Sequence, residues 1–336
     1  MESGIAHNGD VQIAYEDFGK PGGRPLLLIS GLDDQMISSW PDRLCEALAA
    51  AGLHAVRYDH RDAGLSTHFT GRKKAYELTD MIGDMMAVFD AMGWESANLA
   101  GLSMGGGLAQ FAALLHPQRV RTLTAISSIP QSGQKVRGTA RYMRFFPGPF
   151  KLAFRRYSDS PEGKQRMMTD IIRLTEARSL PLDDEWVRQT AAEALRRHAP
   201  DRYARSRQLA AGYAAKLPDG GIARITQPVL VISGDEDPIV KAPAAGRALA
   251  KAVPHGRFVL VHPWDTWPRP PCGRNWSARS PGTQPEAGRR AIATQRNHDG
   301  GAKMLNYPKR SARALLNYTQ RPSSRCPSIS VPYTVL

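Results

Sequence analysis

Short apolar runs alternate with helical patterns along the first 262 residues, and this alternation limits the fold more than any other feature of the chain. The runs lie at residues 11–15, 26–29, 54–58, 98–100, 123–126, 229–232 and 258–261. Residues 11–15 alternate apolar and polar side chains, as a half-exposed edge strand does, whereas the other runs are typical of buried, mostly parallel strands. Apolar side chains in residues 78–92 recur at helical spacing and predict a core-facing helix. Strands joined by crossover helices predict an α/β fold with a mostly parallel, twisted sheet.

A long helical insertion interrupts this alternation. Between residues 131 and 216 the strand patterns stop, and residues 160–174 and 182–198 are the clearest helical segments. Such an insertion between two strands predicts a cap over the carboxyl edge of the sheet, where α/β folds bind their ligands. The insertion is rich in arginine, which indicates a solvated helix face, with a binding patch as the weaker alternative; these residues are Arg196, Arg197, Arg202, Arg205 and Arg207.

The domain organisation follows from these patterns. Residues 1–130 form the first part of an α/β core, residues 131–216 the helical cap, and residues 217–262 the second part of the core. Residues 263–336 differ in composition from everything before them and are discussed below.

The pentapeptide Gly-Leu-Ser-Met-Gly at residues 101–105 follows a predicted strand and opens a helix predicted over residues 106–115. Glycines two residues before and two residues after a serine allow a turn that is too sharp for side chains, so the hydroxyl stands at the tip of the strand. This G-x-S-x-G pattern in a strand-turn-helix context is the nucleophile elbow. Ser103 is therefore the candidate nucleophile.

Backbone amides near Ser103 are candidates for an oxyanion hole. Ser30, Gly31 and Leu32 end the first buried strand, where a second N–H is needed beside the one that follows the serine. The amides of Leu32 and Met104 would then bind the developing oxyanion.

An acidic turn contains the candidate catalytic carboxylate. The sequence Gly-Asp-Glu-Asp-Pro at residues 234–238 follows a buried strand, so its carboxylates reach the same sheet edge as Ser103. We favour Asp237 over Asp235, because Asp237 is fixed by the following proline and faces the exit of the loop. Its role would be to orient an imidazole and to stabilise the imidazolium. The charged loop at residues 59–66, DHRDAGLS, we interpret as structural and held by its own side chains.

Together these motifs resemble the α/β-hydrolase superfamily and, within it, the aclacinomycin methylesterase group of actinobacterial esterases. The resemblance covers about residues 1–262 and rests on the elbow, the oxyanion strand, the DHRDAGLS loop and the GDEDP turn. It implies an α/β-hydrolase fold and a serine hydrolase that cleaves a carboxylic ester through an acyl-enzyme without cofactor or metal. The group also suggests a methyl ester of a polyketide-like acid as substrate. Serine at the elbow disfavours an aspartate-nucleophile epoxide hydrolase or dehalogenase.

The catalytic histidine is not where the resemblance places it. The base follows the acid in this superfamily, and His255, His262 and His298 are the histidines after Asp237. Family members carry a Gly-His pair near position 266, where this chain has Thr266. His262 lies about four residues early and is the fallback base, although a packed or solvent-facing histidine is the better interpretation there. The chain as written is thus expected to be impaired, and the alternative is a catalytically dead α/β-hydrolase fold that acts as a small-molecule binding module.

The last 74 residues do not have the composition of a folded segment. Residues 263–336 hold 12 basic and 3 acidic residues and 10 prolines, but only 8 Ile, Leu, Val or Phe. Such a segment cannot bury enough apolar surface to offset its ordering entropy, which predicts a disordered extension. The codons for residues 263–268 are CCN TGG GAY ACN TGG CCN; read from the third base, they encode a glycine followed by histidine or tyrosine. We therefore interpret residues 263–336 as frameshifted.

The distribution of charge and the number of cysteines indicate which binding partners and which cellular compartment to expect. The formal charge is +14, but the last 74 residues carry most of it, without clustered lysine or arginine runs or a recognisable nucleic-acid module, so no nucleic-acid partner is expected. Three cysteines make no disulfide framework and favour a reducing compartment. The chain shows neither a secretory signal nor a membrane-spanning apolar run. We expect a cytoplasmic protein that acts on a small-molecule ester, with no membrane partner.

Overall fold

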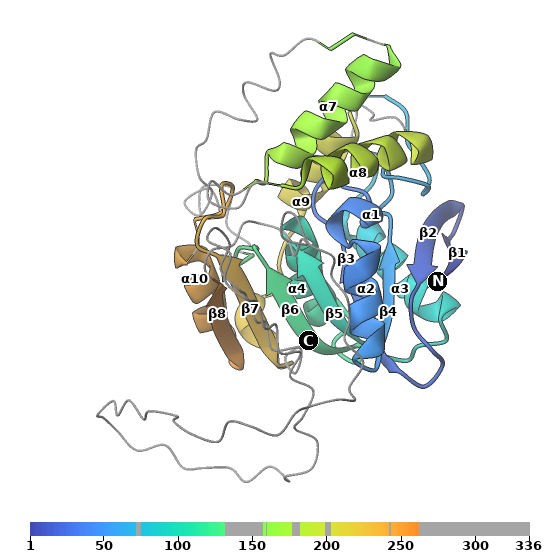
Figure 1. Ribbon diagram of the computed structural model, residues 1–336. Helices are drawn as coiled ribbons and strands as arrows, with labels where there is room; N and C mark the ends of the chain where they lie inside the picture. The colour runs from blue at the N-terminus through green and yellow to red at the C-terminus, as the bar shows by residue number, and fades with distance from the viewer. Residues whose placement is uncertain are drawn as a thin grey trace, which may run out of the picture.

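A twisted sheet of eight strands forms the centre of the computed structural model, in the order β1-β2-β4-β3-β5-β6-β7-β8 (Figure 1). The structure describes residues 1–71, 75–131, 157–158, 160–176, 182–198, 203–241 and 243–261. The strands are β1 Glu2–Asn8, β2 Val11–Asp17, β3 Arg24–Ile29, β4 Leu53–Tyr58, β5 Ala97–Leu102, β6 Val120–Ile126, β7 Val229–Gly234 and β8 Gly256–Val261. β1, β2 and β4 pair antiparallel, and the pairs from β4 through β3, β5, β6 and β7 to β8 are parallel.

Every apolar run predicted as a strand lies within a strand, but the predicted edge strand does not lie at the edge. β2, which contains residues 11–15, pairs with β4 on one side and with β1 on the other. β1 takes the edge position, and its sequence, ESGIAHN, lacks the apolar pattern that would predict a strand. It forms because Asn8 and Val11 pair across a two-residue hairpin whose first residue, Gly9, has a φ of 60°.

Helices cover both faces of the sheet. α3 (Leu78–Ala91), α4 (Met104–Leu115) and α10 (Ala244–Ala252) pack on one face, and α2 (Asp42–Ala50) packs on the other. The methionines of the predicted helix fill the core, because Met81 and Met85 are buried against the sheet. Two short elements, α1 (Met36–Ser39) and η1 (Gly221–Arg224), connect larger ones.

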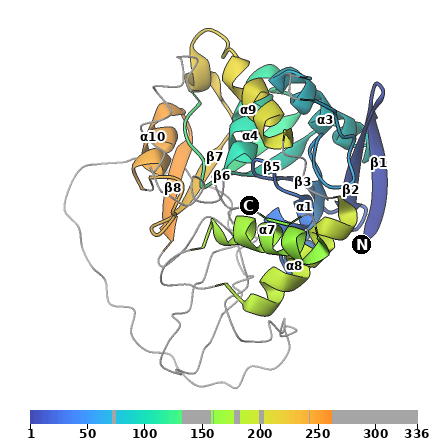
Figure 2. The same cartoon turned by 90° about the horizontal axis from the view of Figure 1, so that it is seen from above.

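The insertion between β6 and β7 contains α7 (Pro161–Arg173), α8 (Asp184–Arg197) and α9 (Ala204–Ala214). α7 begins where Ser160 caps the helix ahead of Pro161, and α8 begins where Asp183 accepts the amide of Trp186. Figure 1 shows α7 and α8 above the upper ends of the strands, and Figure 2, seen from above, shows them displaced to the side of the sheet away from α3 and α4. α8 touches the core there, since Gln35 Nε2 donates to Ala194 O at 2.9 Å. In the described part of the chain, the insertion is therefore helical and lies over the core.

The prediction of a solvated arginine face on the insertion is wrong for two of its residues. Arg207 is 1% exposed and Arg197 has a buried side chain, and both pair with carboxylates of the core. Arg196 and Arg205 are exposed as predicted, and Arg202 lies outside the described residues. Sequence pattern cannot distinguish the two cases, because the acidic partners are far away in the chain.

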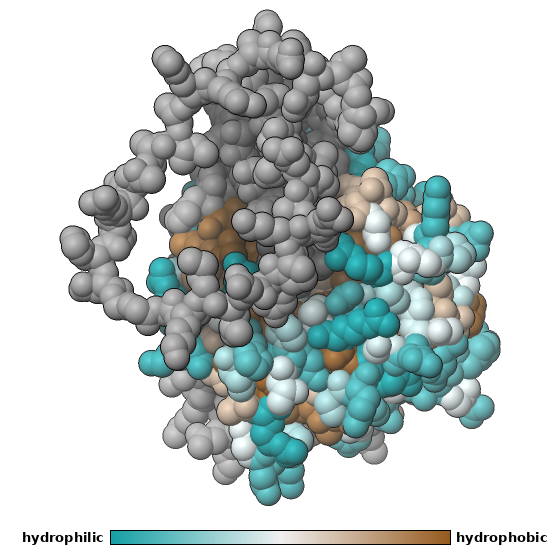
Figure 3. All heavy atoms as spheres, turned by 90° about the horizontal axis from the view of Figure 1, so that it is seen from below, coloured by the Kyte–Doolittle hydropathy of each residue, from teal (hydrophilic) through white to brown (hydrophobic). Residues whose placement is uncertain are grey.

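The end of the molecule opposite the cap is shown in Figure 3, where the described surface mixes hydrophilic side chains with smaller hydrophobic areas. Within the described ranges, no helix is both long and apolar enough to cross a membrane. The segment that we interpret as frameshifted, residues 263–336, lies outside the described residues together with His262.

Candidate active site

Ser103 occupies a strained turn between β5 and α4. Its φ is 50° and its ψ is −111°, a backbone conformation that a non-glycine residue keeps only when its surroundings fix it. The Ser103 N–H donates to Ile126 O at 2.8 Å, and the Ser103 carbonyl accepts from Gly106 N at 3.1 Å and Ser128 Oγ at 2.9 Å. The side chain is partly exposed. The turn thus holds the serine by its backbone and leaves it accessible to solvent.

The glycines around Ser103 are required by close backbone contacts. A Cβ at Gly101 would lie 2.3 Å from the carbonyl carbon of Gly105, and a Cβ at Gly105 would lie 2.3 Å from Ile29 O. Non-bonded atoms do not approach a Cβ this closely, so any other residue at either position would require a shift of the backbone. The G-x-S-x-G spacing is therefore a packing requirement of this turn.

The amides of Leu32 and Met104 lie on neighbouring elements beside Ser103. Ile29 of β3 is in register with Gly101 of β5, so the two strands end side by side. A Cβ at Gly31 would lie 3.9 Å from the Cβ of Ser103. Met104 is the first residue of α4, and first-turn amides of a helix have no intrahelical acceptor. This arrangement is suited to stabilising negative charge next to the serine oxygen.

Asp237 is the buried carboxylate of the acidic turn. It is 0% exposed, and its Oδ1 accepts the amides of Ile239 and Val240, each at 2.8 Å. Asp235 and Glu236 are both more exposed than Asp237. Burial and two backbone hydrogen bonds give Asp237 a fixed orientation, which supports its choice over Asp235.

The sheet register relates the acid to the serine. Leu102 pairs with Ile126, and Ile126 pairs with Ile232, so β6 alone separates β5 from β7. Neighbouring strands lie about 4.8 Å apart, which puts the ends of β5 and β7 about 10 Å from each other. A single side chain between them, such as an imidazole, can contact groups on both strands.

The chain leaves the sheet beside the acidic turn. Val261 ends β8 in register with Gly234, and Asp235 N donates to Val261 O at 3.3 Å. His262, His298 and Thr266 lie outside the described residues. His255 is exposed and precedes β8, at the amino end of the strand and thus away from the elbow. The structure accordingly brings Ser103, Asp237 and the chain segments that carry the Leu32 and Met104 amides to one edge of the sheet, and the candidate base His262 lies outside the described residues.

A buried histidine contacts the chain directly after β3. His60 is 1% exposed, and its Nε2 lies 3.0 Å from Ser30 O, so this nitrogen must be the donor. Burial lowers the pKa of His60, an effect only partly opposed by the hydrogen bond to the Ser30 carbonyl. Sequence reasoning assigned His60 to a structural loop, and its contact with Ser30 agrees with that assignment.

The DHRDAGLS loop is held in part by its own side chains, since Asp59 Oδ2 accepts Leu65 N at 3.0 Å, and the charges of its DHRD segment also pair with distant elements. Arg61 pairs with Asp84 of α3 at 2.6 Å, and Asp59 accepts from Arg197 of α8 at 2.7 Å. Asp62 pairs with Arg207 of α9 at 2.7 Å. The loop therefore fastens the cap and α3 to the end of β4.

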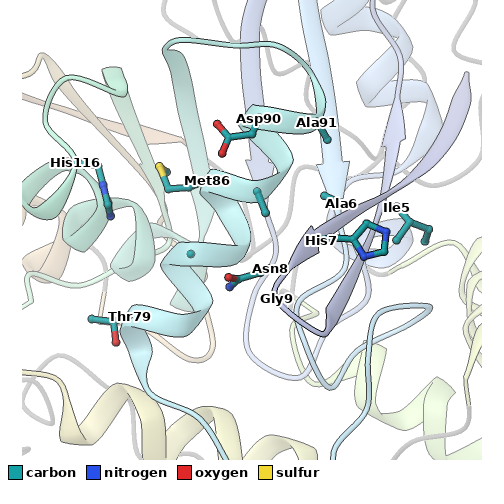
Figure 4. Close-up of a pocket in the computed structure, with 12 residues that line it drawn as sticks. Ile5, Ala6, His7, Asn8, Gly9, Thr79, Met86, Asp90, Ala91 and His116 are labelled. Carbon is teal, nitrogen blue, oxygen red and sulfur yellow. The ribbon is translucent and has the colours of Figure 1, made fainter.

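Two hollows lie away from the elbow. One, of about 620 Å³, lies between β1 and α3, with Asn8, Met86, Asp90 and His116 around it (Figure 4). The other, of about 490 Å³, is lined by residues that include Pro25 and His54 at the amino ends of β3 and β4, and Trp94 between α3 and β5. The described residues contain no cluster of three or more His, Cys, Asp or Glu that could hold a metal ion.

Comparison with known proteins decides the family. The sequence pattern of the alpha/beta hydrolase fold family matches residues 24–268. The chain belongs to the α/β-hydrolase family. This confirms the predicted fold class and the predicted enzyme class, a hydrolase of this superfamily.

Curated relatives share most of the chain. Rhodomycin D methylesterase DauP of Streptomyces sp. (strain C5) is 30% identical over 289 residues, which covers 78% of this chain and 91% of that protein. Rhodomycin D methylesterase DnrP of Streptomyces peucetius is 30% identical over 282 residues, with the same coverage of 78% and 91%. The resemblance to methylesterases that the motifs indicated is thereby confirmed.

Solved structures agree on the fold of this hydrolase. The esterase RhEst1 from Rhodococcus sp. ECU1013 superposes with a TM-score of 0.60 at 21% identity, covering 77% of this chain and 90% of that chain. The enol-lactonase from Burkholderia xenovorans LB400 gives a TM-score of 0.56 at 22% identity, covering 77% and 91%. At this identity the likeness concerns the fold alone.

Proposed function

We propose that this α/β-hydrolase is built to cleave a carboxylic ester with Ser103 as nucleophile. The observation that carries the proposal is the strained Ser103 backbone at the tip of β5, with the amides of Leu32 and Met104 beside it. Asp237 orients the base. The base is a histidine that follows β8, and in the chain as written His262 is the fallback for this role.

The reaction would run in two halves. Ser103 Oγ attacks the ester carbonyl carbon while the base takes its proton, and the Leu32 and Met104 amides bind the oxyanion that forms. The intermediate then collapses to an acyl-enzyme, and the base returns the proton to the leaving alcohol. Water attacks the acyl group in the second half, which releases the acid and restores the serine hydroxyl. No step needs a cofactor or a metal ion.

The proposed substrate is a small-molecule ester, specifically a methyl ester of a polyketide-like acid. Two relatives that this chain matches over 91% of their length are named as rhodomycin D methylesterases. α8 lies against the loop that follows β3, so a bulky acid would bind between cap and sheet edge. We place this activity in the cytoplasm, with neither membrane nor nucleic acid as partner.

A fluorophosphonate probe tests the nucleophile, because it reacts with an activated serine and not with ordinary hydroxyls. The probe is applied to a variant in which the shifted reading of the gene replaces everything after Pro263. We expect a single labelled peptide that contains Ser103. Ser103→Ala should abolish the labelling, and Ser96→Ala, at the other end of β5, should not change it. Labelling that survives Ser103→Ala would disprove the assignment.

A second candidate is a catalytically dead α/β-hydrolase fold that binds a small molecule. Thr266 at the position expected for the catalytic histidine favours it. Turnover of p-nitrophenyl acetate by the chain with the shifted reading restored separates the two: an enzyme hydrolyses the ester in a Ser103-dependent way, and a binding module does not.

A further inference from the structure

A cap glutamine reaches the loop that carries the Leu32 amide. Gln208 of α9 is 1% exposed, and its Oε1 accepts the N–H of Asp33 at 2.8 Å. Its Nε2 donates to Arg61 O at 3.1 Å. One partner is a donor and the other is an acceptor, so the orientation of the carboxamide is determined. Gln208 thus bridges two loops of the core from the cap.

The Asp33 amide is significant because Asp33 directly follows Leu32. Asp33 has a φ of 57°, a left-handed conformation that costs free energy in a non-glycine residue unless neighbouring groups hold it. On the other side of Leu32, Gly31 N donates to Ser39 Oγ at 3.3 Å. The amides that flank Leu32 are therefore both anchored by side chains, one from α1 and one from the cap.

We propose that Gln208 is a positioning residue, which fixes the backbone at Asp33 and so directs the Leu32 N–H toward the oxyanion beside Ser103. This inference rests on the proposed function. Gln208 does not touch the reacting atoms and acts through the loop.

Other contacts join the same loop to the cap at a greater distance from Leu32. Asp59 accepts Met36 N at 2.8 Å through Oδ1 and Arg197 at 2.7 Å through Oδ2. Gln35 Nε2 donates to a carbonyl of α8 at 2.9 Å. These contacts hold the loop after β3 against the cap helices. Gln208 holds Asp33, which is the residue next to the Leu32 amide. The Leu32 amide is therefore directed toward the oxyanion only when the cap helices are packed on the loop after β3.

Kinetics of Gln208 variants test the proposal in the chain with the shifted reading restored, with p-nitrophenyl acetate as substrate. Gln208→Leu removes both hydrogen bonds, and we expect kcat to fall about tenfold with KM within about twofold, since loss of a whole oxyanion donor costs about 100- to 1000-fold. Gln208→Glu keeps an acceptor for the Asp33 amide but places a second oxygen against Arg61 O, so it should recover only part of kcat. Gln189→Leu, on the exposed face of α8, is the matched control and should leave both constants unchanged. An unchanged kcat in Gln208→Leu would overturn the proposal.

Hydrogen exchange provides a readout that does not depend on activity. In the chain as written, Gln208→Leu should accelerate exchange in residues 30–36 and leave β5 unchanged, whereas Gln189→Leu should alter neither. Unchanged exchange in residues 30–36 would show that Gln208 does not hold the loop and would overturn the inference by itself. A restored chain that hydrolyses no ester contradicts the proposed function instead, and the exchange result still decides whether Gln208 fixes the loop.

Discussion

Arg207 of the cap and Asp62 of the core form an ion pair that is fully buried. Arg207 Nε lies 2.7 Å from Asp62 Oδ2, Arg207 Nη2 lies 2.9 Å from Asp62 Oδ1, and both side chains are 0% exposed. Asp62 also accepts from Tyr76 Oη at 2.8 Å and from the Phe69 amide at 2.7 Å. The carboxylate is saturated with donors, and the pair fixes α9 to the loop after β4.

Removing the arginine should therefore destabilise the protein strongly. Arg207→Met leaves the Asp62 carboxylate buried without its cation, which typically costs about 3–5 kcal/mol. Chemical denaturation measures this loss. Arg196→Ala removes an exposed arginine from α8 and should change the free energy of unfolding by less than about 0.5 kcal/mol. A loss below 1 kcal/mol in Arg207→Met would mean that the pair is not buried in solution.

His60 should make stability depend on pH. Burial lowers its pKa in the folded state, so below about pH 6.5 the unfolded chain binds a proton that the folded protein does not. The free energy of unfolding should fall as pH decreases from 7 to 5, by up to about 1.4 kcal/mol per pH unit from this group. His60→Gln keeps a donor for Ser30 O but cannot titrate, and denaturation at several pH values should give a shallower slope. Equal slopes for both proteins would exclude His60 as the titrating group.

The elbow should not tolerate a methyl group at Gly105. A Cβ there would meet the Ile29 and Ser30 carbonyl oxygens at 2.3 and 2.6 Å, so Gly105→Ala must displace β3 or α4. We expect a loss of about 1–3 kcal/mol in thermal or chemical unfolding. Gly212→Ala is the control, because no atom lies within 4 Å of its Cβ and alanine favours a helix, so stability should rise by up to about 1 kcal/mol. Equal effects of the two substitutions would contradict the packing that we describe.

The chain as written should hydrolyse p-nitrophenyl acetate several orders of magnitude more slowly than the chain with the shifted reading restored. Without an imidazole between Ser103 and Asp237, the serine attacks without a general base, and loss of a triad member leaves about 1000- to 10000-fold catalysis over water. Steady-state kinetics of both proteins measure the difference. Full activity of the chain as written, abolished by His262→Ala, would identify His262 as the base and disprove the frameshift interpretation of the site.

Local patterns were sufficient to predict every described strand except β1, and most of the candidate site. Buried parallel strands are continuous apolar runs, and each of the predicted runs lies inside a strand. Ser103 and Asp237 were predictable because each lies within three residues of the end of a strand, and the residues at the carboxyl ends of parallel strands lie at one edge of the sheet. The glycine spacing around Ser103 identified the elbow before its contacts with Ile29 were known.

Only the tertiary structure decided the contacts between residues that are distant in the sequence. β1 has no strand pattern of its own and forms because β2 pairs with it. Arg207 and Asp62 are 145 positions apart, and Gln208 and Asp33 are 175 positions apart. Polar residues on a helix have the same sequence pattern whether they face water or a buried carboxylate. The sequence by itself therefore determined seven of the eight described strands, the elbow and the acidic turn, because these depend on local periodicity and backbone sterics. Only the packing of the cap on the core decided which arginines are buried and which glutamine holds the Leu32 loop.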